Sequence, residues 1–92
     1  MENINEIRKK INNIDKDMAI LFQKRMELVN LVIEHKRNNN LHIYDPKREE
    51  ELIDINLKYI NDENIKQYYL DFIKEIINIS KKYQEDILNK KK

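Results

Sequence analysis

The stretch INEIRKKINNIDKDMAILFQKRMELVNLVIEHKR, residues 4–37, decides the fold. Its apolar side chains recur every three or four residues, which is the period of one face of an α-helix. The members of this stripe are Ile4, Ile7, Ile11, Ile14, Met18, Leu21, Leu28 and Val32. The cluster Asn38-Asn39-Asn40 ends the pattern, because asparagine competes with a helix for backbone hydrogen bonds. We therefore predict a first helix from about Ile4 to about Arg37.

Two shorter helices are predicted after the first. Asp45-Pro46 is a helix start, because aspartate caps the first turn and proline suits the first helical position. The second helix carries Leu52, Ile53, Ile55, Tyr59 and Ile60 and ends near Asn61-Asp62. The third helix carries Ile65, Tyr69, Phe72, Ile73, Ile76, Ile77, Ile87 and Leu88. No repeat or second domain is visible, so the sequence predicts one all-α domain over residues 1–92.

The composition excludes several function classes. The 92 residues include no glycine and no cysteine, and the formal net charge is +1 with 38% charged residues. The chain therefore has no glycine-rich phosphate loop, no thiolate metal site and no strongly basic face for nucleic acid. Apolar runs are far shorter than a membrane span, and the polar, acidic N-terminus is wrong for a secretory signal. His35 and His42 lack metal-ligand spacing. We expect a cytoplasmic protein without metal, cofactor, nucleic-acid or membrane partner.

The length of the first helix predicts self-association. At 1.5 Å per residue it is about 50 Å long, whereas a compact monomer of this size is roughly 30–35 Å across. The helix must overhang, which leaves part of its apolar stripe exposed. A second copy of the chain is the simplest cover, because symmetric dimers are the commonest oligomers. The heptad-like spacing also allows a plain coiled coil.

Two cations lie on the apolar face of the first helix. Arg25 occupies a position where the stripe requires an apolar residue, and a buried guanidinium needs an anionic partner. Lys36 follows eleven residues later, so it shares that face about 16 Å along the axis. The partner is a protein carboxylate or a ligand, and Lys36 alone also fits a solvated lysine. Arg8 lies about 25 Å from Arg25 and cannot reach the same small ligand within one chain.

Polar residues at three further places are candidates. Ser80 and Gln84 share the apolar face of the third helix, where they serve either as helix–helix contacts or as ligand contacts. Arg48 and Glu49 open the second helix beside Asp45 and also fit ordinary first-turn residues. The chain has fourteen lysines but only four arginines, of which Arg8, Arg25 and Arg48 are three. Arginine suits the bidentate binding of carboxylates.

These residues resemble the all-helical chorismate mutases of the short, monofunctional type, along nearly the whole chain. The matching pieces are Ile7-Arg8-Lys9-Lys10-Ile11, Ile14-Asp15, Gln23-Lys24-Arg25-Met26-Glu27-Leu28-Val29, Lys36, Ile43-Tyr44-Asp45, Pro46-Lys47-Arg48-Glu49-Glu50, and Ser80 with Gln84. Each piece is weak alone, and the ordered set is specific. The resemblance implies an intertwined homodimer of three-helix chains, and rearrangement of chorismate to prephenate in aromatic amino acid biosynthesis.

The resemblance also implies roles for individual residues. Arg8 from the partner chain and Arg25 would bind the two carboxylates of chorismate. Lys36 and Gln84 would be the catalytic pair at the ether oxygen. The remaining substrate contacts would come from Asp45, Arg48, Glu49 and Ser80. No metal or cofactor is implied.

Two other functions fit parts of the pattern. An isochorismate-pyruvate lyase has the same fold and a similar cationic pocket, but it forms salicylate and pyruvate. A non-catalytic helical dimer explains the stripe, but it leaves the polar residues on apolar faces without a reason. Product analysis separates the two enzymes, and thermal stabilisation by a dicarboxylate separates an enzyme from a scaffold.

Overall fold

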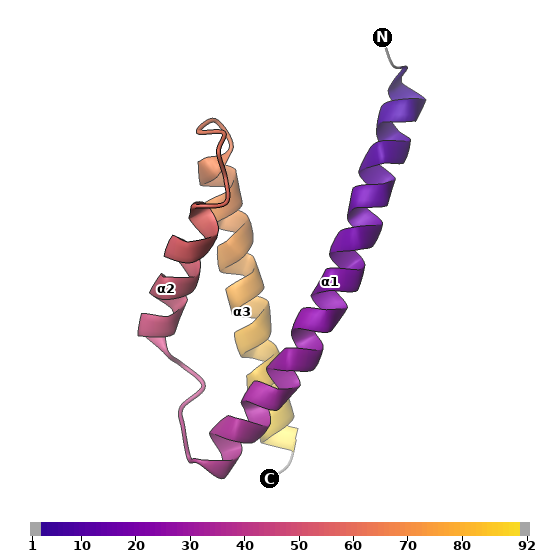
Figure 1. Cartoon of the computed structure of the whole chain (residues 1–92). Coiled ribbons are helices and arrows are strands. Elements are labelled where there is room, and N and C mark those ends of the chain that lie inside the picture. Colours follow the sequence, from indigo (N-terminus) through magenta and orange to yellow (C-terminus); the bar gives the residue numbers. More distant parts are fainter. Residues whose placement is uncertain (1–2, 91–92) are drawn as a thin grey trace.

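The chain folds into three helices that enclose one small core. The computed structural model describes residues 3–90, and over that range it contains α1 (Ile4–Asn38), α2 (Pro46–Leu57) and α3 (Lys66–Lys90) and no strand. The all-α class is confirmed. Figure 1 shows that α2 and α3 lie side by side, while α1 meets α3 through its C-terminal half. The N-terminal half of α1 projects away from both other helices.

Asparagines form both ends of α1. The side chain of Asn3 accepts a hydrogen bond from the backbone N–H of Glu6 at 3.0 Å, which satisfies a donor of the first turn. At the other end Asn40 has a φ of 54°, in the left-handed region. The backbone N–H of Leu41 then bonds the carbonyl of Lys36 at 2.9 Å. This is a Schellman ending, with asparagine in the position that glycine usually takes. The predicted end at Arg37 is one residue short of the observed Asn38.

Replacing Asn40 by alanine is expected to lower the free energy of unfolding by about 1–2 kcal/mol, because a Cβ without a local hydrogen bond is disfavoured at positive φ. Asn40→Gly is expected to be neutral or slightly stabilising. Urea unfolding measures both variants at one protein concentration. Equal stability of the alanine and glycine variants would contradict the expectation that alanine is strained at position 40.

The second helix begins as predicted but ends earlier. The Asp45 carboxylate accepts a hydrogen bond from the Arg48 backbone N–H at 3.1 Å, and Pro46 occupies the first turn. The predicted end near Asn61-Asp62 is wrong, since α2 stops at Leu57. The side-chain amide of Asn56 donates to the Leu52 carbonyl at 2.7 Å, while Tyr69 of α3 donates to its oxygen at 3.4 Å. Asparagine thus ends the helix, and the chain continues in tighter turns through residues 59 and 60.

The buried core is small for a chain of this length. Only Ile33, Ile73 and Ile77 among the described apolar side chains are buried, at 1%, 5% and 8% exposure. The radius of gyration is 16.7 Å, compared with about 12 Å for a compact domain of this size. The folding back of α2 on α3, and of α3 on α1, rules out a plain coiled coil. Much apolar surface is left without a cover inside one chain.

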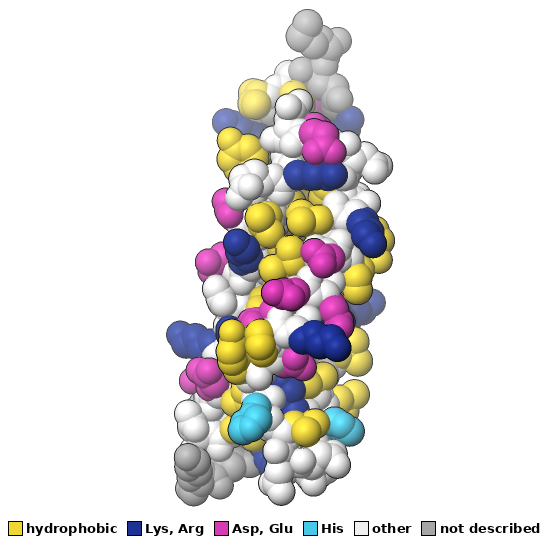
Figure 2. Space-filling view, turned by 90° about the vertical axis from the view of Figure 1, so that its left-hand side faces the viewer, with side chains coloured by type: hydrophobic (Ala, Val, Ile, Leu, Met, Phe, Trp, Pro, Cys, Tyr) yellow, Lys and Arg dark blue, Asp and Glu magenta, His cyan; other side chains and the backbone are white. Residues whose placement is uncertain are grey.

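The predicted stripe on α1 is exposed along its whole N-terminal half. Its members are 41–61% exposed from Ile4 to Leu21. Figure 2, which views the molecule from the α2 side, also shows exposed hydrophobic side chains between the charged ones. Apolar patches of such extent on a small protein mark a binding surface. No helix within residues 3–90 is long and apolar enough to cross a membrane.

Candidate active site

A cavity of about 300 Å³ lies where α1, α2 and α3 converge. Its volume is at the lower end of the range for small-molecule sites. Apolar side chains form part of its wall: Leu28, Val29, Val32, Ile43, Leu52 and Ile77. The polar part of the wall consists of Arg25, Lys36, Asp45, Arg48, Glu49, Ser80, Lys81 and Gln84. The cavity thus combines a hydrophobic surface with an unusually dense set of charges.

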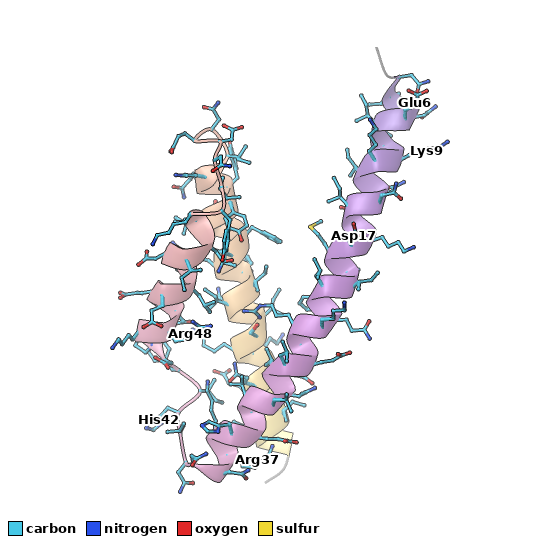
Figure 3. All side chains as sticks on the ribbon, in the orientation of Figure 1. Glu6, Lys9, Asp17, Arg37, His42 and Arg48 are labelled. Atoms are coloured by element: carbon cyan, nitrogen blue, oxygen red, sulfur yellow. The ribbon has the colours of Figure 1, made fainter. Side chains whose placement is uncertain are left out.

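The fold brings seven of the eight candidate residues to this cavity. They come from the second half of α1, the first turn of α2 with its cap, and the second half of α3. Arg8 does not line the cavity. Figure 3 labels its neighbours Glu6 and Lys9 on the projecting half of α1, far from Arg48 at the start of α2. Within one chain, the arginine at position 8 is therefore separated from the others, as the helix length predicts.

Arg25 and Ser80 are hydrogen-bonded to each other across the α1–α3 interface. The Arg25 guanidinium donates through Nη1 to the Ser80 hydroxyl oxygen. Ser80 is only 6% exposed, and its own hydroxyl hydrogen remains available as a donor because guanidinium cannot accept. Burial lowers the pKa of Arg25, and the neighbouring Arg48 lowers it further. Arg25 therefore has a second cation nearby, and within residues 3–90 it forms no ion pair with a carboxylate.

Lys36 and Gln84 form a second contact between α1 and α3. The Lys36 ammonium donates to Gln84 Oε1 at 2.9 Å and to the Ile43 carbonyl at 3.0 Å. Because lysine has no acceptor, the amide of Gln84 must present its oxygen to Lys36. The NH₂ group of Gln84 is then left as a donor, and Lys36 keeps a third N–H. Gln84 is 8% exposed, so its orientation is held by packing as well.

The charges in the cavity do not balance. Four cationic side chains against two carboxylates give the lining a net charge of +2. Burial lowers the pKa of Lys36, and the nearby Asp45 carboxylate offsets part of that effect. Desolvated cations without matching counter-charges favour an anionic ligand. The lining is therefore complementary to a small dianion.

The first turn of α2 supplies the acidic side of the cavity. Asp45 uses its carboxylate as the cap of α2, and Arg48 makes a long, exposed contact of 3.9 Å with Glu51. Glu49 instead forms an ion pair with Lys81 of α3 at 2.8 Å. An exposed pair such as that of Arg48 contributes little to stability, so Arg48 is free to turn toward a ligand.

Sequence analysis missed Lys81. On a helix with so many lysines, a lysine next to Ser80 has the appearance of a solvated residue. The available signal was its helical spacing, since Lys81 precedes Gln84 by three residues and so shares part of its face. Its partner Glu49 lies on another helix, and no local pattern links the two.

The arrangement is suited to binding and polarising an anion. Within residues 3–90 no group of three histidine or acidic side chains could hold a metal ion. Ser80 is hydrogen-bonded to a cation, and among the described residues no base contacts its hydroxyl, which is the wrong setting for a nucleophile. The cavity offers cations for carboxylates, together with N–H donors from Lys36 and Gln84, which are in direct contact with each other.

Comparison with known proteins agrees with this geometry. The family model described as chorismate mutase type II matches residues 7–85. The T-protein of Haemophilus influenzae is 41% identical over 49 residues, which is 53% of this chain but only 13% of that protein. The chain thus spans a small part of that relative. No solved structure matches the chain. The match over residues 7–85 confirms the resemblance seen in the motifs, and the chain belongs to the type II chorismate mutase family.

Proposed function

We propose that the protein rearranges chorismate to prephenate in this cavity, as a step of aromatic amino acid biosynthesis. The observation that carries the proposal is the contact of 2.9 Å between Lys36 and Gln84. It orients one cation and one amide so that both retain a donor for the same ligand atom. The apolar side chains of the wall and a net charge of +2 on the lining fit a cyclic dicarboxylate.

The carboxylates of chorismate are assigned to the arginines. Arg25, supported by Ser80, binds one carboxylate, and Arg48 contributes at the anionic end. Glu49, with the backbone near Asp45, accepts the hydrogen bond of the ring hydroxyl. Planar guanidinium groups suit this task because they bind a carboxylate through two parallel hydrogen bonds.

The reaction requires no nucleophile, metal or cofactor. It is unimolecular: the ether C–O bond breaks while a new C–C bond forms, and no proton is exchanged. The protein holds the flexible dianion in its compact reactive conformer, which removes much of the entropic barrier. Lys36 and Gln84 donate to the ether oxygen, where negative charge develops as the C–O bond breaks. These donors act most strongly in the transition state, so their effect falls on kcat.

The second part of the proposal is a homodimer in which Arg8 completes the partner's cavity. The exposed stripe on the N-terminal half of α1 supports a second chain as its cover. Arg8 precedes Arg25 by seventeen residues, or about 25 Å of helix, so it cannot serve the cavity of its own chain. An antiparallel pair of α1 helices brings each Arg8 toward the other cavity.

The direct test is chorismate consumption by the purified protein, followed by identification of the product. Rapid conversion to prephenate supports the proposal. Formation of salicylate and pyruvate from isochorismate, without prephenate from chorismate, would assign the cavity to a lyase. A folded protein without turnover of either compound would contradict both enzymatic functions.

Binding of a dicarboxylate transition-state analogue is expected to weaken at alkaline pH. Burial lowers the pKa of Lys36 in the free protein, and a bound anion raises it again because it favours the ammonium form. Affinity is therefore constant below the pKa of the free protein and falls as the pH rises from that value toward the pKa of the complex. Titrations between about pH 7 and about pH 10 measure this effect. Lys36→Met should bind more weakly and show a flatter pH profile, and an unchanged alkaline profile would assign the titration to another group.

A further inference from the structure

Lys81 makes two contacts at the edge of the cavity that no part of the proposed mechanism uses. Its ammonium lies 2.8 Å from Glu49 Oε1 and 4.9 Å from the centre of the Tyr44 ring. The side chains of Lys81 and Glu49 are only 28% and 23% exposed. The hydrogen bond with Glu49 raises the pKa of Lys81, so the lysine stays cationic across the physiological range.

These contacts join α3 to the N-terminus of α2. Glu49 belongs to the first turn of α2, and Tyr44 immediately precedes the capping residue Asp45. Lys81 of α3 therefore contacts both chain segments that flank the cap, one through Glu49 and the other through Tyr44. The first turn of α2 and its cap together supply three of the charged groups that line the cavity. Movement of this turn would displace all three groups at once.

The pair also affects the charge that a ligand meets. A carboxylate beside a dianion repels it unless a cation stands close by. Removal of Lys81 would reduce the net charge of the lining from +2 to +1 and leave Glu49 without its ion-pair partner. Isolated exposed ion pairs contribute little to stability. This pair differs because it is mostly shielded from water and is supported by a cation–π contact.

We infer that Lys81 is a positioning residue that holds the Glu49 carboxylate in place as the acceptor for a hydroxyl group of the substrate and offsets its repulsion of the dianion. The inference rests on the proposed function of the cavity. Lys81 acts through Glu49 and makes no contact with the reacting bonds. Because the hydroxyl is bound alike in the substrate and in the transition state, the effect of Lys81 falls on KM and not on kcat.

The test is steady-state kinetics of chorismate turnover by Lys81→Met, which keeps the length of the side chain and removes its charge. We expect KM to rise about tenfold while kcat changes by less than about threefold. Lys82→Met is the matched control, because it removes the same charge from the adjacent, exposed position of α3. Its KM should stay within about twofold of the unchanged protein. Lys81→Arg keeps the cation and should restore KM to within about threefold.

A double-mutant cycle with Glu49→Gln shows whether Lys81 acts through Glu49. In the Glu49→Gln background, Lys81→Met is expected to raise KM by less than about threefold. An equal rise in both backgrounds would overturn the inference, as would an equal rise in Lys82→Met. The kinetics of Lys81→Gln are measured in parallel as a second substitution that removes the charge. Circular dichroism of every variant shows whether a folding defect, and not the lost charge, causes a change in KM.

The two proposals fail in different ways. Normal turnover by the unchanged protein, with an unaltered KM in Lys81→Met, would overturn the role of Lys81 and leave the proposed function intact. Absence of turnover by the unchanged protein would overturn the proposed function and, with it, this inference.

Discussion

Replacing Lys36 by alanine is expected to lower kcat for chorismate rearrangement by about 10²–10³-fold, and Gln84→Ala is expected to do the same. In the proposed mechanism, each substitution removes one of the two groups that donate to the ether oxygen. Lys36→Ala also frees Gln84 from the contact of 2.9 Å that orients its amide, so the two losses should not add fully. Stopped assays of chorismate consumption measure kcat, and KM should change less than kcat.

Matched controls exist on both helices. Lys24→Ala removes an exposed lysine from α1, and Gln67→Ala removes an exposed glutamine from α3; neither residue lines the cavity. Both controls should keep kcat within about twofold of the unchanged protein. Circular dichroism should show intact helices in all four variants. Near-normal kcat in Lys36→Ala or Gln84→Ala would contradict the role that we assign to that residue.

Mixing two inactive variants is expected to restore activity. In the proposed dimer, Arg8→Ala removes the arginine that each chain would contribute to its partner's cavity, so both sites should be impaired, with kcat/KM reduced about 10²-fold or more. Lys36→Ala also impairs both sites, because Lys36 lines the cavity of its own chain. In a mixed dimer, one site lacks both side chains while the other has both. Refolding an equal mixture from urea should therefore yield about a quarter of the unchanged activity, since half of the dimers are mixed and each has one intact site.

The outcome decides where Arg8 acts. If Arg8 served the cavity of its own chain, every site in the mixed dimer would lack one of the two residues, and no activity would return. Mixing Gln84→Ala with Lys36→Ala is the control, because both substitutions impair the cavity from within one chain and cannot complement each other. Restoration in that control would overturn the assignment of these two residues to one chain. A monomer in sedimentation experiments would contradict the proposed dimer.

Much of the fold was predictable because it depends on local patterns. The three-to-four spacing of apolar residues predicts α1, and its observed end at Asn38 lies one residue from the expected one. The cap at Asp45 is likewise a local signal, confirmed by its hydrogen bond to the Arg48 backbone. The predicted end of α2 is wrong because the observed end depends on Asn56. That side chain both bonds its own helix and receives a hydrogen bond from Tyr69 of α3, and helix–helix contacts are not visible in a local window.

The candidate site was predictable only in its composition. Arg25 on an apolar stripe and the pair Ser80 and Gln84 on another are detectable because a polar group at a core position requires a partner. The partners themselves lie far apart in the sequence. Arg25 and Ser80 are separated by 55 positions, and Lys36 and Gln84 by 48. Helical periodicity indicates the face on which a residue lies, but not which other helix that face meets.

The amino-acid sequence thus determined the three helices, their polar exceptions and the membership of a family, because each is encoded in spacing and residue type along the chain. The tertiary structure alone decided that seven of these residues line one cavity of about 300 Å³ and that Lys36 donates to the side-chain oxygen of Gln84. It also decided that Lys81 pairs with Glu49. These arrangements arise from the packing of α3 against α1 and α2, which depends on contacts between distant segments and not on any local preference.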